Sequence, residues 1–168
     1  MQQLQAYATE QQGPNPLAAW DVAYYSEKLR QSRYDLSQEE LKPYFALPQV
    51  QAGLFAVVNR IYGIEVTPCT GVSTWHEDVG FYQVAYKGKA IGYFYFDLYA
   101  RDQKRGGAWM DECRNRQYQA NGKLQLPVAY LVCNFAAPVG DQPALLTHNE
   151  VTTLFHEFGH GLLDRKSV

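Results

Sequence analysis

The chain has 168 residues, of which 46% are hydrophobic, so it is long enough for one domain with a buried core. Its 15 basic and 17 acidic residues form no long run of one charge, which argues against nucleic acid or a membrane as partner. No stretch has the features of a secretory signal or the ~20 apolar residues of a membrane span. Cys69, Cys113 and Cys133 have no close pair, which favours reduced thiols over disulfides. We therefore expect a soluble, cytoplasmic protein.

The first third of the chain is predicted to be helical. A break at residues 14–16 precedes a helix over residues 17–34, whose aromatic side chains are expected to belong to the core. Residues 37–43 begin with a capping-box pattern, Ser-Gln-Glu-Glu, and predict a short helix. A third helix is expected over residues 48–62, because Gly63 provides a helix stop.

The middle of the chain changes to the pattern of β-structure. Two aromatic-rich runs at residues 81–86 and 90–96 flank Lys-Gly-Lys at residues 87–89, which predicts a β-hairpin. The basic glycine pair in residues 104–107 is typical of a loop, although it also permits backbone to approach a ligand. Residues 126–135 predict a further strand shortly before the last helix.

That last predicted strand has two interpretations. If it is a free sheet edge, an extended peptide can pair with its backbone. If it lies inside the sheet, it meets no substrate. We expect the edge position.

The last helix carries a recognisable motif, His156-Glu157-Phe158-Gly159-His160. This is the spacing of a zinc-peptidase helix, in which the two His residues share one face and can reach one metal ion, with Glu157 beside them. The motif predicts two metal ligands, His156 and His160, and a base.

The sequence around the motif predicts a well-formed amphipathic helix. Thr147 and Glu150 have capping-box spacing, so the helix is expected to begin near residue 148. The apolar stripe that turns the two His residues to the opposite side consists of Val151, Leu154, Phe155, Phe158 and Leu162. Gly159 and Gly161 weaken the helix by about 1 kcal/mol each, which suggests a close approach by another element or by substrate.

Alternatives to the metal site remain open at this point. A bare five-residue match can arise by chance on a solvent-facing helix, but a capped amphipathic helix is the context that the motif requires. Asp164, one turn after His160, could complete a ligand set on the same helix. His76, Glu77 and His148 are the remaining candidates, and the two histidines fit loop or cap positions better.

Beyond the motif, the sequence resembles the thimet oligopeptidase and oligopeptidase A family of zinc metallopeptidases, and most of all its bacterial oligopeptidase A type. The resemblance covers nearly the whole chain in collinear order. Its segments are residues 20–25 (WDVAYY), 94–101 (FYFDLYAR), 104–111 (KRGGAWMD), 127–130 (PVAY), 147–150 (THNE) and 156–162 (HEFGHGL).

The resemblance implies a cytoplasmic metalloendopeptidase that hydrolyses short oligopeptides with one zinc ion. His156 and His160 correspond to zinc ligands and Glu157 to the general base, which accepts a proton from a zinc-activated water and passes it to the leaving amine. The expected fold is α+β, mainly helical: a zincin-like catalytic-domain fragment with a small antiparallel sheet before the metal-binding helix. No substrate-binding residue, cofactor other than zinc, or oligomeric state is assigned.

This sequence also departs from the family pattern. The family takes its third protein ligand from a Glu well downstream of the second His, and it has a further His where this chain has Leu163. We therefore expect residues 1–168 to be a partial peptidase domain, helical over 1–63 and strand-rich over 64–135, with the metal-binding helix at 147–164. The alternative is a truncated, inactive fragment that binds only peptide or a partner chain.

Overall fold

The computed structural model describes residues 1–34 and 38–163. The chain divides into two compact units, Met1–Pro43 and Tyr44–Val168, and each is described by itself.

The first unit consists of helices. They are α1 (Gln2–Glu10), α2 (Asp21–Tyr34) and α3 (Gln38–Leu41), with the 3-10 turn η1 (Lys42–Tyr44) after them. Helix α1 lies in the segment that the sequence did not assign to an element. Ser37, which opens the predicted capping box, lies outside the described residues.

Two details of the predicted second helix are wrong. It begins at Asp21 rather than residue 17, because the Asp21 carboxylate accepts a hydrogen bond from the Ala18 backbone N–H at 3.0 Å, as an acidic residue at a helix start does. Its aromatic residues are also not all core residues, since Trp20 is 82% exposed and Tyr24 is 56% exposed. Among the residues of this unit whose burial is described, the buried apolar ones are Leu4 and Ala8 on α1.

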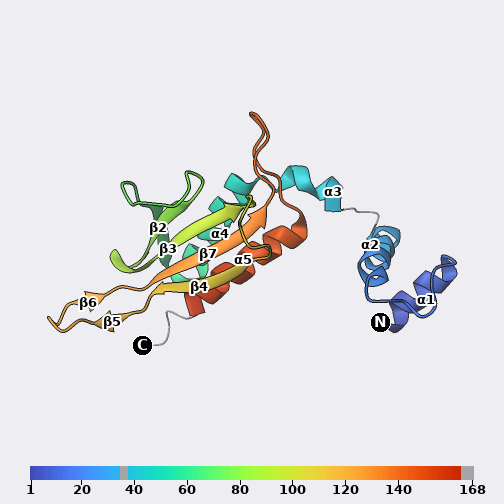
Figure 1. The fold of residues 1–168 in the computed structure, drawn as a ribbon, viewed down its shortest axis with the longest axis horizontal. Coiled ribbons are helices and arrows are strands. Elements are labelled where there is room, and N and C mark those ends of the chain that lie inside the picture. Colours follow the sequence, from blue (N-terminus) through green and yellow to red (C-terminus); the bar gives the residue numbers. More distant parts are fainter. Residues whose placement is uncertain (35–37, 164–168) are drawn as a thin grey trace. The chain divides into compact units, whose positions relative to one another are not determined.

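The second unit is built on a five-stranded sheet (Figure 1). Its strands, in spatial order, are β1 (Ile64–Pro68), β2 (Gly80–Tyr86), β3 (Lys89–Tyr99), β7 (Val128–Phe135) and β4 (Trp109–Arg114). A separate two-stranded ribbon pairs β5 (Gln117–Tyr118) with β6 (Leu124–Gln125).

The predicted hairpin is confirmed. Strands β2 and β3 pair antiparallel from Gly80 opposite Phe96 to Tyr86 opposite Lys89. The turn residues Lys87 and Gly88 both have positive φ, 49° and 74°. Positive φ at both central residues suits the right-handed twist of the flanking strands, so a two-residue turn closes this hairpin.

The prediction of an antiparallel sheet is wrong, because the sheet is mixed. Strands β3 and β7 are parallel, with Tyr93 opposite Val128 and Phe96 opposite Leu131. Parallel neighbours require a long crossover connection, and here that connection is residues 100–127, which contain β4 and the β5–β6 ribbon. A pattern of strand residues does not reveal this arrangement, since it depends on where the crossover returns.

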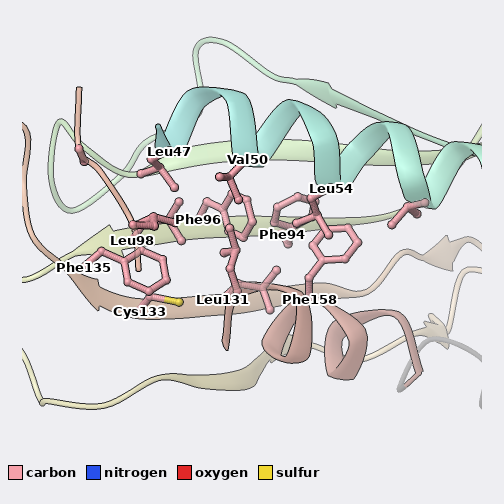
Figure 2. Packing of buried hydrophobic residues seen from close by; sticks show 14 of the residues in the cluster. Leu47, Val50, Leu54, Phe94, Phe96, Leu98, Leu131, Cys133, Phe135 and Phe158 are labelled. Carbon is pink, nitrogen blue, oxygen red and sulfur yellow. The ribbon is translucent and has the colours of Figure 1, made fainter. Parts of the chain in front are cut away.

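Two long helices cover one face of the sheet. They are α4 (Leu47–Tyr62), which ends at Gly63 in a left-handed conformation as predicted, and α5 (His148–Leu163). Figure 2 shows side chains of α4 and α5 meeting those of β3 and β7. The fully buried members of this core include Leu54, Phe94, Leu131, Leu146 and Leu154.

The starts of the two helices are tied together. Leu47 donates its backbone N–H to the Ala144 carbonyl at 2.8 Å, and Leu146 donates to the Phe45 carbonyl at 2.9 Å. The segment before α5 is thereby anchored beside the start of α4, which fixes where α5 begins. Among the residues described, none of the helices has the length and apolar character needed to cross a membrane.

Candidate metal and substrate site

Helix α5 begins with the predicted capping box. The Thr147 backbone N–H donates to a Glu150 carboxylate oxygen at 2.7 Å, and the Glu150 N–H donates to the Thr147 hydroxyl at 3.2 Å. These two bonds satisfy backbone donors that the first turn leaves free. The prediction that the helix starts near residue 148 is confirmed, and the cap fixes the rotation at which α5 enters the core.

The apolar stripe of α5 faces the core with one exception. Leu154 is fully buried and Phe158 is 3% exposed, and Val151 and Leu162 pack at the margin of the cluster. Phe155 instead remains 36% exposed and lines an apolar hollow of about 660 Å³ between α4 and α5.

The two motif histidines lie on the opposite, exposed side of α5. Their Nε2 atoms are 3.0 Å apart, and their rings are nearly perpendicular, at 89°. Zinc binds imidazole nitrogen at about 2.0–2.1 Å, so two nitrogens this close can contact one ion. His156 and His160 therefore fit two positions of a metal site.

The described residues supply no further ligand to that pair. Across 1–34 and 38–163, no group of three or more His, Cys, Asp or Glu side chains could hold a metal ion. His76 lies in the β1–β2 connection, where its Nδ1 accepts the Asp78 backbone N–H at 3.2 Å. His148 is the first residue of α5, with its ring 6.1 Å from that of Phe45. Asp164 lies outside the described residues.

At about 100° per residue, Glu157 lies on the flank of α5 between the exposed histidines and the buried apolar stripe. It is half-buried, and its charge reaches the buried thiol of Cys133 on β7. Burial, and to a smaller extent the negative charge of Glu157, raises the pKa of Cys133 to about 12. Cys133 thus remains a protonated, apolar core residue, while Glu157 lies on the flank of α5 next to the histidine face.

The sheet edge nearest α5 is β4. Strand β7 lies between β3 and β4, so the prediction that residues 126–135 form the free edge is wrong. The alternative interpretation, an interior strand, is the correct one. Strand β4 was not predicted because half of the residues of Trp109–Arg114 are charged, most are exposed, and the segment lacks the apolar alternation of a half-buried strand.

Strand β4 packs directly against α5, as Figure 1 shows. A Cβ atom at Gly161 would lie 3.3 Å from Leu131 Cδ2 and 3.9 Å from Met110 Cγ. The glycine therefore allows the helix to approach β7 and β4 one residue after His160, which confirms the close approach predicted there. Gly159 has no such neighbour, since nothing in the described chain lies within 4 Å of its Cβ position.

A buried charged cluster lies at the end of β3, and sequence analysis did not identify it. Asp97 is 4% exposed and accepts two bonds from Arg101 at 2.7 Å, one from Lys104 at 2.9 Å and one from the Trp75 indole at 2.9 Å. Burial raises the pKa of the Asp97 carboxyl, but these hydrogen bonds outweigh it and hold the pKa at about 2, below its usual 3.8. An aspartate inside a run of buried strand residues was the available signal.

Comparison with known proteins shows the family to which the chain belongs. The model of peptidase family M3 matches residues 1–164. Oligopeptidase A of Haemophilus influenzae is 51% identical over 163 residues, and oligopeptidase A of Escherichia coli is 53% identical over 161 residues. The dipeptidyl carboxypeptidase of Escherichia coli is 40% identical over 161 residues.

These matches cover unequal shares of the two proteins. They include 96%, 95% and 95% of this chain but 24%, 24% and 23% of the respective relatives. The chain thus spans about a quarter of the length of the curated relatives that it matches. Because the family model matches nearly all of the chain, the chain belongs to peptidase family M3.

Proposed function

We propose that this chain forms the metal-binding helix and the substrate-binding edge of a zinc metalloendopeptidase that hydrolyses short oligopeptides. The observation that carries the proposal is the pair of facing imidazoles on the exposed side of α5, 3.0 Å apart and next to Glu157. The family supports the reaction class, because its members that match this chain are named as peptidases. A single zinc ion and a cytoplasmic location remain predictions from the sequence.

His156 and His160 would hold the metal through their Nε2 atoms. A His, His and carboxylate ligand set favours zinc over other divalent ions. When bound, such an ion acts as a Lewis acid toward the scissile carbonyl and lowers the pKa of water.

Glu157 supplies the proton transfers. Its carboxylate accepts a proton from the attacking water and then donates that proton to the nitrogen of the leaving amine. Glu157 lies on the flank of α5, beside the histidine face but not on it. This position suits a general base better than a metal ligand. The adjacent turn of α5 is rigid, since Leu154 and Phe158 anchor it in the core.

Strand β4 would hold the substrate. It stands at the end of the strand order, so its outer backbone groups are available to an extended peptide. Backbone pairing recognises any sequence, which fits an enzyme acting on varied oligopeptides. Because Met110 of β4 lies near Gly161, the residue after His160, a paired peptide would pass close to the histidines.

The first test uses a chain extended to the length of its oligopeptidase relatives. Glu157→Gln should retain metal and lose about 10²–10⁴-fold in turnover, as expected for loss of a general base. His156→Ala should lose the metal. The measurements are metal content and hydrolysis of a quenched oligopeptide, with Glu65→Gln on the exposed edge strand β1 as the matched control. Near-normal turnover of Glu157→Gln would remove the assigned base.

The competing function is binding of peptide or a partner chain without turnover. The same assay separates the two. Stoichiometric metal with Glu157-dependent hydrolysis supports the enzyme, whereas peptide binding with neither metal nor hydrolysis supports the binding protein.

A further inference from the structure

The connection from β3 to the edge strand β4, residues 100–108, is held in place by a buried lysine. The Lys104 side chain is 8% exposed. Its ammonium donates to the carbonyls of Tyr99 at 2.7 Å, Cys133 at 2.5 Å and Asp97 at 3.0 Å, and to the Asp97 carboxylate at 2.9 Å. One side chain of the connection thus binds the carboxyl ends of two parallel strands.

Those carbonyls lie where the β3–β7 ladder is irregular. The register shifts between Asp97, opposite Val132, and Tyr99, opposite Phe135. A bulge interrupts regular backbone pairing, and buried carbonyls near it require other donors. The Lys104 ammonium provides these donors, and the Asp97 carboxylate compensates its charge.

Asn134 of β7 holds the second half of the same connection. Its side-chain amide donates to the Arg105 carbonyl at 2.8 Å and to the Gly107 carbonyl at 2.6 Å. Gly107 has φ of 95°, a conformation that other residues rarely adopt. Lys104 and Asn134 therefore fix the path of the chain up to the residue that precedes β4 by two positions.

What these two residues fix is the start of the edge strand. Strand β4 begins at Trp109, opposite Val132, and its second residue, Met110, lies 3.9 Å from the Cβ position of Gly161. Gly161 follows His160 directly. A shift of the connection would therefore move the edge strand relative to the histidine pair.

We propose that Lys104 and Asn134 are positioning residues, which set the edge strand β4 against α5 so that a paired oligopeptide is held in register with His156 and His160. The proposal rests on the proposed peptidase function, and it adds that the register depends on residues that touch neither metal nor substrate. The substrate class it favours is extended peptide long enough to lie along β4.

The experiment uses the chain extended to the length of its oligopeptidase relatives, with Asn134→Ala, Lys104→Met and Lys104→Arg. Lys89→Met, at the exposed start of β3, is the matched control. Amide hydrogen exchange of residues 109–114 reports the placement of β4. Metal content, kcat and KM are measured on a short peptide that spans only the scissile bond and on a longer one that reaches along the strand.

In Asn134→Ala and Lys104→Met, the amide hydrogens of β4 should exchange at least about tenfold faster than in the unaltered chain. KM for the longer peptide should rise about tenfold, because one or two backbone hydrogen bonds are lost. Metal content, kcat and the KM of the short peptide should change little. Lys104→Arg should keep the exchange of the β4 amides and the KM for the longer peptide close to those of the unaltered chain, because arginine retains a buried cation with several donors. Lys89→Met should match the unaltered chain.

Unchanged exchange of β4 in both variants would overturn the proposal, as would an equal loss of kcat on both peptides. Asn134→Ala keeps the test decisive if Lys104→Met does not fold. If the unaltered chain hydrolyses neither peptide, the proposed function fails, whereas faster exchange in Asn134→Ala would still support the placement of β4 by these residues.

Discussion

The two units of the chain differ in how many of their side chains are buried. The unit of residues 44–163 has a buried apolar cluster that joins two helices to three strands, and it also contains a buried ion pair. The unit of residues 1–34 and 38–43 buries Leu4 and Ala8, leaves Trp20 82% exposed and forms ion pairs at its surface. The candidate metal, catalytic and substrate-binding residues that the structure describes all lie in the first of these two.

The difference shows that helices with similar sequence patterns can contribute different amounts to the free energy of unfolding. Both α2 and α5 are long helices with several apolar residues. Within its own unit, α5 packs its stripe against a sheet, whereas the described part of the unit of α2 contains helices and no strand. Burial rather than helix propensity supplies most of a helix's stability in a protein. Mutations of matched residues in the two units should therefore have unequal effects.

The largest contrast should come from aromatic truncation. Phe158→Ala removes a ring that is 3% exposed and that contacts the rings of Phe55, Phe94 and Phe96, so it should lower the free energy of unfolding by about 3–5 kcal/mol. Trp20→Ala should change it by less than about 0.5 kcal/mol. Denaturant unfolding of both variants measures the contrast, and a large effect of Trp20→Ala would contradict it.

A smaller contrast is expected for the ion pairs. Asp97→Asn should cost about 1.5–3 kcal/mol, because it removes a buried carboxylate that accepts bonds from Arg101 and Lys104. Glu39→Gln breaks the exposed pair with Lys42 and should cost about 0–1 kcal/mol.

The contribution of Asp97 to the free energy of unfolding should also depend on pH. Its pKa is lowered from 3.8 to about 2 in the folded chain, so the stabilisation is fully present above the unfolded value and is lost as pH falls through about 2. Unfolding curves of the unaltered chain and Asp97→Asn should therefore converge between pH 4 and pH 2. Curves that stay equally far apart over this range would contradict the assigned pKa.

The smallest contrast lies within α5 itself. Gly161→Ala should lower the free energy of unfolding by about 1 kcal/mol, because the added methyl group would press on the buried Leu131. This cost outweighs the gain in helix propensity. Gly159→Ala meets nothing within 4 Å and should stabilise by about 0.5–1 kcal/mol. Thermal unfolding of the two variants would show opposite shifts. Shifts of the same sign would mean that α5 does not depend on close approach at Gly161.

The parts of the fold that sequence analysis predicted correctly are those fixed by neighbouring residues. The capping box of Thr147 and Glu150, the hairpin turn at Lys87 and Gly88, and the helix stop at Gly63 each follow from local backbone chemistry. The His156 and His160 pair belongs to the same class, because four residues along a helix bring two side chains to one face.

The sequence by itself therefore determined the helix α5, the pairing of its two histidines, and the resemblance to a peptidase family. Only the tertiary structure decided that β7 is interior, that β4 is the edge and that Lys104 and Asn134 hold it there. The physical reason is the distance along the chain over which each contact acts. A turn or a cap involves residues a few positions apart, whereas strand order depends on where a crossover of 28 residues, 100–127, returns to the sheet.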